Sequence, residues 1–139
     1  MLVKPNLFFE GNAVEAIQFY QAVFVTEAQN VVRYGDFPQQ PGAPPMNETY
    51  APLIANARIS LGNSFFNVCD VLPPAKVTAG DHIRMDLVFT EEDNSSIGQI
   101  FAALSEGGIV IKSLEKVFFS PAYGEIKDRF GIEWAVMQM

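Results

Sequence analysis

One stretch near the C-terminus decides the fold: Tyr123-Gly124-Glu125-Ile126-Lys127-Asp128-Arg129-Phe130-Gly131-Ile132-Glu133-Trp134-Ala135-Val136. It predicts a strand, a tight turn and an apolar final strand. The carboxylate of Asp128 can accept hydrogen bonds from the backbone that follows it, and Gly131 can adopt the positive φ with which such a turn ends. Trp134 is expected in the core.

The strands and helices expected elsewhere fall into two similar series. In the first series, a strand at 2–9 leads to a helix after Asn12, which has the position of an N-cap with Glu15 three residues later. Strands at 28–34, 55–61 and 64–70 follow, the last two as a hairpin around Gly62-Asn63. In the second series, an alternating strand at 82–89 turns Ile83, Met85 and Leu87 toward a helix.

The second series continues like the first. The acidic run 91–94 precedes a helix that ends at Gly107-Gly108, and strands follow at 109–118, 122–127 and 132–137. Phe9 and Phe89 correspond at an offset of 80 residues. The order of one strand, one helix and three strands therefore occurs twice, which indicates an α+β chain of two pseudo-equivalent halves, at about 1–72 and 80–139.

Composition excludes several classes of function. The chain has 139 residues, a formal charge of −7 and an isoelectric point near 4.5, with no basic stripe. A phosphate backbone needs an excess of Lys and Arg, so no nucleic-acid partner is expected. No apolar run approaches the length of a membrane span, and no membrane partner is expected. A single Cys69, in a strand-like run, fits a reducing cytoplasm and a buried small side chain.

A long loop is expected between the two strands that precede the hairpin. Residues 35–52 hold five of the nine prolines. Such a loop can cover a binding mouth, contact a second subunit or act as a mobile spacer, and the residues leave these alternatives open.

Several motifs together resemble one known superfamily over nearly the whole chain. They are residues 7–24, 33–36, 56–62, 104–108 and 123–134. The chain resembles the PhnB-like branch of the vicinal-oxygen-chelate superfamily, which includes glyoxalase I, bleomycin-resistance proteins and extradiol dioxygenases. The resemblance implies two tandem βαβββ modules that form a cupped mixed β-sheet with the helices outside, and it implies a homodimer.

The resemblance also implies four metal-ligand positions, and this chain departs from the family at them. The first position falls near Asn6 or Pro5, and the second near Asn67 or Cys69. The third falls at Arg84, or at His82 if the register slips by two residues. The fourth falls at Ala135. Asn is a poor ligand alone, Arg repels cations and Ala offers no donor, so no bound transition metal or other cofactor is expected.

The candidate ligand-binding residues follow from strand position and side-chain chemistry. His82, Arg84 and Asp86 share one face of the expected strand, where Arg84 suits an anion unless Asp86 neutralises it. Glu133 could act as an acid, a base or a displaced ligand. A concave sheet lined by aromatic residues could stack a planar apolar ligand. The candidates are Asn6, Phe8, Asn67, His82, Arg84 and Glu133.

Two functions of different class remain open. One is a non-enzymatic protein that binds an unidentified small molecule in the concave sheet. The alternative is a metal-dependent lyase, isomerase or dioxygenase with a rearranged site that uses His82 and Glu133. Labels of this branch include a ubiquinone-pathway methyltransferase, but the chain has no glycine-rich methyl-donor loop after a strand.

Overall fold

The computed structural model describes residues 1–93 and 96–139. Within them the chain forms two compact units, Met1–Val77 and Thr78–Met139. The expected acidic run before the second helix ends at Asn94, which lies outside the described residues. Of the helices that are described, none is long and apolar enough to cross a membrane.

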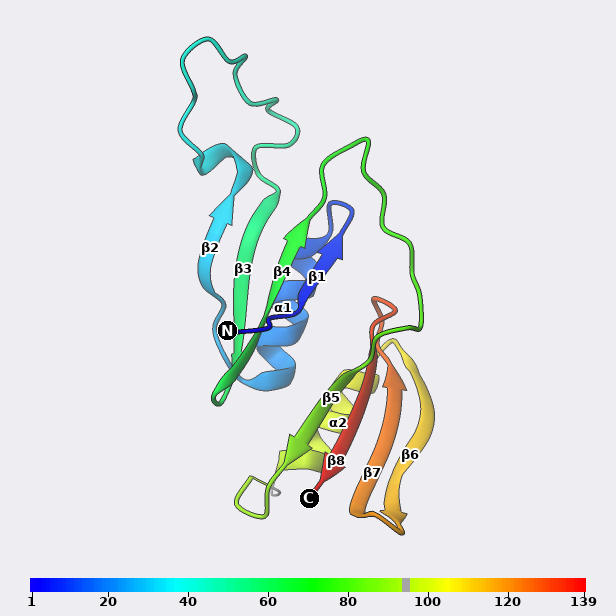
Figure 1. Cartoon of the computed structure of the whole chain (residues 1–139). Coiled ribbons are helices and arrows are strands. Elements are labelled where there is room, and N and C mark those ends of the chain that lie inside the picture. Colours follow the sequence, from blue (N-terminus) through cyan, green and yellow to red (C-terminus); the bar gives the residue numbers. More distant parts are fainter. Residues whose placement is uncertain (94–95) are drawn as a thin grey trace. The chain divides into compact units, whose positions relative to one another are not determined.

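The first unit is a four-stranded mixed sheet with one long helix on one side (Figure 1). The sheet has the order β1-β4-β3-β2, in which β1 is parallel to β4 and the other pairs are antiparallel. The elements, in chain order, are β1 (Asn6–Phe9), α1 (Ala13–Phe24), β2 (Gln29–Arg33), the 3-10 turn η1 (Tyr34–Asp36), β3 (Ile54–Leu61) and β4 (Ser64–Asp70).

The second unit repeats this topology. Its sheet has the order β5-β8-β7-β6, with β5 parallel to β8. The elements are β5 (Met85–Phe89), α2 (Ile97–Ser105), β6 (Ile109–Val117), β7 (Ser120–Lys127) and β8 (Glu133–Gln138). The expected α+β fold of two tandem βαβββ modules is therefore confirmed.

Strand register gives the equivalence of the two units residue by residue. The Phe9 carbonyl accepts a hydrogen bond from the Val71 N–H at 2.8 Å, and the Phe89 carbonyl accepts one from Met139 at 2.9 Å. The offset of 80 between the first strands is thus correct, and it makes Asp86 the counterpart of Asn6. The resemblance implied the third ligand position at Arg84 or His82, which precede this counterpart of Asn6 in the chain.

Each sheet packs one apolar face against its helix. In the first unit, Tyr20 of α1 meets Phe66 of β4 edge to face, with ring centroids 5.3 Å apart. In the second unit, a Cβ on Gly124 of β7 would lie 2.4 Å from the ring of Phe101 in α2. Trp134 is fully buried. Because side chains alternate along a strand, the odd-numbered residues of β7 and β8 project from the face opposite the helix.

The strand expected at 82–89 begins only at Met85. Its ladder with β8 starts at the pair of Met85 and Trp134, and the residues before it have no strand partner. His82 therefore precedes the strand, and Ile83 is 81% exposed instead of facing a helix. Polar and apolar residues alternate from His82 onward, but only the residues from Met85 onward pair with β8 and form a strand.

The start of α1 is stabilised by a residue distant in sequence. Asn12 has the N-cap position, but its side chain makes no capping hydrogen bond. Instead, Asp70 Oδ1 accepts hydrogen bonds from the N–H groups of Gly11 at 2.8 Å and Ala13 at 3.0 Å, and Asp70 Oδ2 accepts one from Ile54. One buried carboxylate thereby joins the end of β4 to α1 and β3.

The turn between β7 and β8 has the expected construction. Asp128 Oδ1 accepts hydrogen bonds from the N–H groups of Phe130 at 2.9 Å and Ile132 at 3.0 Å. Gly131 has a φ of 84°. Asp128 Oδ2 also accepts a hydrogen bond from the indole N–H of Trp134 at 2.8 Å, which ties the turn to the core.

Candidate ligand-binding face

Three strands of the first unit place polar side chains in one row on the face opposite α1. Asn6 of β1 pairs with Asn67 of β4, and Asn67 pairs with Arg58 of β3. The neighbours of Asn67 along β4, Phe66 and Val68, are fully buried, and the Phe66 ring meets α1. The side chain of Asn67 therefore projects to the other side of the sheet, together with those of Asn6 and Arg58.

A relay of amides fixes the orientation of Asn67. The backbone carbonyl of Asn30 accepts a hydrogen bond from Asn56 Nδ2 at 3.1 Å, so Asn56 presents its Oδ1 to the sheet. This Oδ1 accepts a hydrogen bond from Asn67 Nδ2 at 2.8 Å. Asn67 is 3% exposed, and its own Oδ1 is buried without a hydrogen-bond partner from the described chain.

Arg58, which pairs with Asn67 from the neighbouring strand β3, has an N–H donor without a hydrogen-bond partner. Its guanidinium carbon is 4.0 Å from the centroid of the Phe65 ring, a cation–π contact. The Nε atom is buried and has no hydrogen-bond partner from the described chain. None of the ion pairs formed by residues 1–93 and 96–139 includes Arg58. A donor and an acceptor without hydrogen-bond partners thus belong to directly paired residues of neighbouring strands.

The apolar part of this face comes from Phe8. It pairs with Cys69 across β1 and β4, on the same side of the sheet as Asn6 and Asn67, and it is 51% exposed. The Cys69 thiol is buried, and its pKa is raised by desolvation and by the nearby Asp70 carboxylate. Cys69 is therefore a buried apolar side chain, while Phe8 offers ring surface next to the amides.

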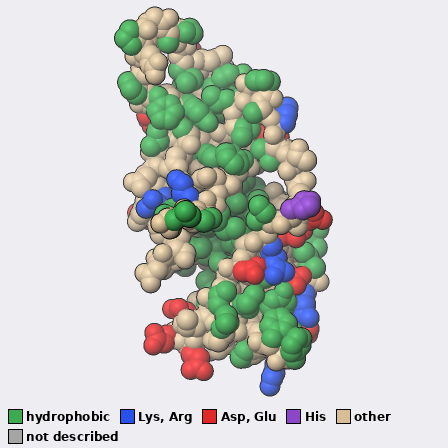
Figure 2. All heavy atoms as spheres, viewed as in Figure 1, with side chains coloured by type: hydrophobic (Ala, Val, Ile, Leu, Met, Phe, Trp, Pro, Cys, Tyr) green, Lys and Arg blue, Asp and Glu red, His purple; other side chains and the backbone are tan. Residues whose placement is uncertain are grey.

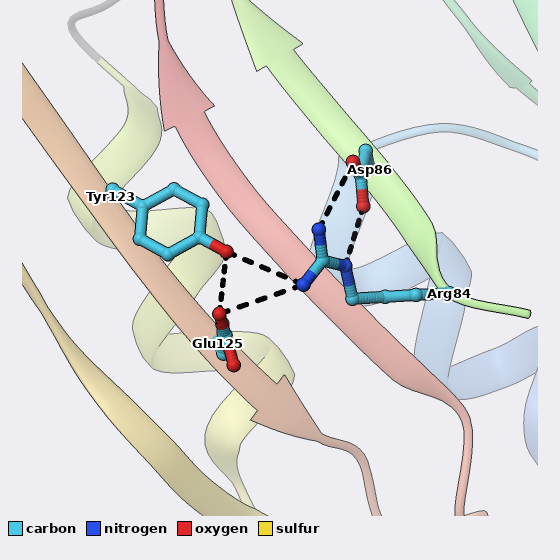
Figure 3. A network of polar contacts seen from close by, with 4 residues as sticks. All are labelled: Arg84, Asp86, Tyr123 and Glu125. Atoms are coloured by element: carbon cyan, nitrogen blue, oxygen red, sulfur yellow. Dashed lines mark hydrogen bonds and ion pairs between the residues drawn. The ribbon is translucent and has the colours of Figure 1, made fainter. Parts of the chain in front are cut away.

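The corresponding face of the second unit carries a closed network (Figure 3). Arg84 donates to both carboxylate oxygens of Asp86, from Nε to Oδ1 at 2.8 Å and from Nη2 to Oδ2 at 3.3 Å. Arg84 Nη1 donates to the Tyr123 hydroxyl at 3.3 Å and lies 3.5 Å from Glu125 Oε1. The Tyr123 hydroxyl donates to the same oxygen of Glu125.

The network spans a strand that contributes no polar group to it. Asp86 belongs to β5 and Glu125 to β7, and between these strands β8 places Ala135, which pairs with both residues. Ala135 is fully buried. The small methyl group leaves room for the guanidinium that connects the two carboxylates, at the position where the family resemblance implies a ligand carboxylate. Figure 2 shows acidic and basic side chains side by side on this unit.

The network makes one pH-dependent prediction. The hydrogen bond to Glu125, with desolvation, raises the pKa of Tyr123. A raised folded-state pKa means that the protonated hydroxyl contributes stability that is complete below about pH 10, the unfolded value, and is lost as pH rises through the folded value. We expect the free energy of unfolding, measured with urea, to be lower in Tyr123→Phe than in wild type. The difference should be constant between neutral pH and about pH 9, and smaller above about pH 10. A difference independent of pH up to pH 11 would contradict the assignment.

The six residues selected from the sequence separate into different surroundings. Asn6, Phe8 and Asn67 share the face of the first unit. In the second unit Arg84 belongs to the closed network, and Glu133 lies 3.0 Å from Lys127 Nζ as an ion pair. His82 is exposed, and Figure 2 shows the imidazole at the surface. Sequence reasoning missed Arg58, Asn56 and Glu125 as site residues, although alternation along the expected strand at 55–61 puts Asn56 and Arg58 on one face.

The residues present do not fit a transition-metal site of the expected family type. Register pairs Asn6 with Asn67 in the first unit, and Asp86 with Ala135 in the second. The two amides are weak ligands, the Asp86 oxygens both accept hydrogen bonds from a guanidinium, and Ala135 has no donor atom. Within the described part of the chain, no three His, Cys, Asp or Glu side chains form a group that could hold a metal ion.

Comparisons with known proteins agree with this architecture. A family model described as 3-demethylubiquinone-9 3-methyltransferase matches residues 2–137. The crystal structure of protein PA1353 from Pseudomonas aeruginosa is 25% identical, with a TM-score of 0.82, over 99% of this chain and 97% of that one. A putative 3-demethylubiquinone-9 3-methyltransferase, PhnB protein, from Bacillus cereus is 22% identical, with a TM-score of 0.71, over the whole of both chains.

A more distant structure shares the fold alone. The fosfomycin resistance protein FosX from Listeria monocytogenes is 9% identical, with a TM-score of 0.62, over 99% of this chain and 91% of that one. The family match over residues 2–137, with PA1353 and the PhnB protein, supports the resemblance to the PhnB-like branch of the vicinal-oxygen-chelate superfamily.

Proposed function

Since the chain belongs to the family described as 3-demethylubiquinone-9 3-methyltransferase, in the PhnB-like branch of the vicinal-oxygen-chelate superfamily, we propose that it binds a small molecule without a metal. The proposed site is the sheet face of the first unit that carries Asn67, Arg58 and Phe8. The observation that carries the proposal is the pair of buried, unpartnered atoms Asn67 Oδ1 and Arg58 Nε.

Unpartnered polar atoms favour a ligand at this face because burial removes their hydration. A buried donor or acceptor without a partner costs about 1–3 kcal/mol. A ligand that satisfies both atoms recovers this free energy, and the half-exposed Phe8 adds apolar contact. The two atoms belong to residues that pair directly across β3 and β4 and share one face of the sheet.

The donor chemistry argues for binding without methyl transfer or metal catalysis. The chain contains no G-x-G-x-x-G sequence that would cradle a nucleotide-like methyl donor. The alternative site at His82 and Glu133 has less support, because Lys127 forms an ion pair with the Glu133 carboxylate and because His82 belongs to no group of three ligand-type residues in the described chain. FosX, which shares this fold, is named a fosfomycin resistance protein.

The proposal is tested by a two-dimensional NMR screen of small polar and aromatic compounds. We expect compounds that bind to shift the amide signals of β1, β3 and β4, and we expect Phe8→Ala to weaken binding severalfold through lost ring contact. Shifts confined to other strands, or no shifts for any compound, would contradict the proposed site.

Elemental analysis of protein purified without a histidine tag separates the two functions. We expect far less than one equivalent of transition metal per chain. One equivalent, lost in His82→Ala, would instead support the metal-dependent alternative.

We also propose that the protein is a homodimer. Phe118 is completely exposed at the turn between β6 and β7, next to Phe119, and Ile109 and Ile111 of β6 are more than half exposed. Exposed apolar side chains along an edge strand and at its end favour contact with a second copy. Sedimentation at micromolar concentration should give a mass of twice 15.4 kDa, reduced by Phe118→Asp. A monomer in the wild type would contradict the proposal.

A further inference from the structure

We infer that the ligand is a small carboxylate with a hydroxyl group on the adjacent carbon, held by Arg58 through the carboxylate and by Asn67 through the hydroxyl. This inference rests on the proposed function and specifies the chemistry that the same face recognises. Its basis is the complementary character of the two unpartnered atoms, because one is a donor and the other an acceptor.

The acceptor character of Asn67 is set by the backbone. The Asn30 carbonyl can only accept, so Asn56 must donate to it through Nδ2 and must present Oδ1 to Asn67. Asn67 must then donate through Nδ2, which leaves Oδ1 as the unpaired atom. A ligand that satisfies Asn67 consequently has to donate a hydrogen bond, and a simple carboxylate cannot do so.

The charge of the ligand follows from a contrast between two arginines. Arg84 is held by the carboxylates of Asp86 and Glu125, whereas no ion pair of the described chain includes Arg58. The Phe65 ring contacts the guanidinium at 4.0 Å and supplies no acceptor for its N–H groups. A guanidinium binds a carboxylate through two parallel N–H donors. A carboxylate on the ligand would therefore accept hydrogen bonds from Arg58, as Asp86 accepts them from Arg84.

Both requirements meet in one ligand fragment. A carboxylate oxygen accepts from Arg58 while a hydroxyl on the adjacent carbon donates to Asn67 Oδ1, which lies on the paired residue of the next strand. An aromatic substituent on that carbon would contact Phe8, whose ring is half exposed on the same face. Mandelate, which carries all three groups, is therefore a suitable probe of the site.

The test compares mandelate with two probes that each lack one group. Phenylacetate lacks the hydroxyl, whereas 2-phenylethanol lacks the carboxylate and carries its hydroxyl one carbon farther from the ring. Dissociation constants come from NMR titration of the intact chain, followed at the amides of β3 and β4. We expect the wild type to bind mandelate about tenfold more tightly than phenylacetate, the value of one additional hydrogen bond, and to bind 2-phenylethanol most weakly.

Substitutions of Asn67 and Arg58 test which residue recognises the hydroxyl and which recognises the carboxylate. Asn67→Leu should bind mandelate and phenylacetate equally. Arg58→Met should weaken both acids at least tenfold and leave 2-phenylethanol unchanged. Arg129→Met, which removes an arginine beside Glu106 in the other unit, should retain the wild-type order. The wild-type comparison of the three probes needs no variant and stands even where a substitution impairs folding.

The outcomes separate this inference from the proposed function. If 2-phenylethanol or other screened compounds shift the amides of this face and mandelate binds no better than they do, the carboxylate anchor is wrong and the binding face stands. Equal affinities for mandelate and phenylacetate in the wild type would overturn the role of Asn67. If no compound shifts this face, the proposed function itself fails.

Discussion

Asp128→Ala is expected to lower the free energy of unfolding by about 3 kcal/mol, because it removes the acceptor of several donors at one turn. The carboxylate is 3% exposed and accepts hydrogen bonds from the N–H groups of Phe130 and Ile132 and from the indole of Trp134. Without it the buried indole N–H loses this acceptor. Urea unfolding followed by circular dichroism measures the effect.

A matched control uses another aspartate of the same unit. Asp81 is exposed, and its replacement by Ala should change the free energy of unfolding by less than about 0.5 kcal/mol. Since Trp134 is the only tryptophan, its fluorescence reports on the same contact in the folded state, and a red shift is expected in Asp128→Ala. A loss below about 1 kcal/mol without a red shift would show that the turn does not depend on this carboxylate.

Asp70→Ala should have an effect of similar size in the first unit, a loss of about 3 kcal/mol. Its two oxygens accept from the backbone N–H groups of Gly11, Ala13 and Ile54, and Asp70 is 1% exposed. Amide hydrogen exchange should show faster exchange at these three residues. Glu10→Ala, which removes an exposed carboxylate paired with Lys76, serves as the control with little change.

Unchanged exchange at Ala13 and Ile54 in Asp70→Ala would contradict the joining role of this residue. Asp70→Asn should be less damaging than Asp70→Ala, because the amide oxygen still accepts while the NH₂ group cannot. The order of wild type, Asn and Ala is therefore part of the expected result.

The sequence predicted most of the strands because their signals are local. Alternating residues and the turn glycines placed the hairpin of β3 and β4 within one residue, and the turn at Asp128 formed as expected. The strand at 82–89 was too long, since alternation alone does not show where the parallel ladder with β8 begins. Asn12 was predicted to cap the first helix, but Asp70 at the end of β4 accepts the hydrogen bond instead. Local sequence patterns cannot predict this contact, because the two residues are far apart in the chain.

The candidate site was predictable only in part. Asn6, Phe8 and Asn67 were found from strand position, which alternation gives directly. The relay from Asn30 through Asn56 to Asn67 joins three strands, and its donor and acceptor sense appears only once the register is known. The spacing of Arg84 and Asp86 suggested that Asp86 could neutralise Arg84. The contacts of Arg84 with Tyr123 and Glu125 were not predicted, because these residues come from β7, which is not adjacent to β5 in the sheet.

The most direct test of the binding face is an intermolecular NOE measurement on the intact protein with a compound that binds in the NMR screen. We expect NOEs from the compound to the ring protons of Phe8 and Phe65 and to the Nδ2 protons of Asn67. NOEs only to residues outside β1, β3 and β4, such as the exposed ring of Phe118, would contradict it.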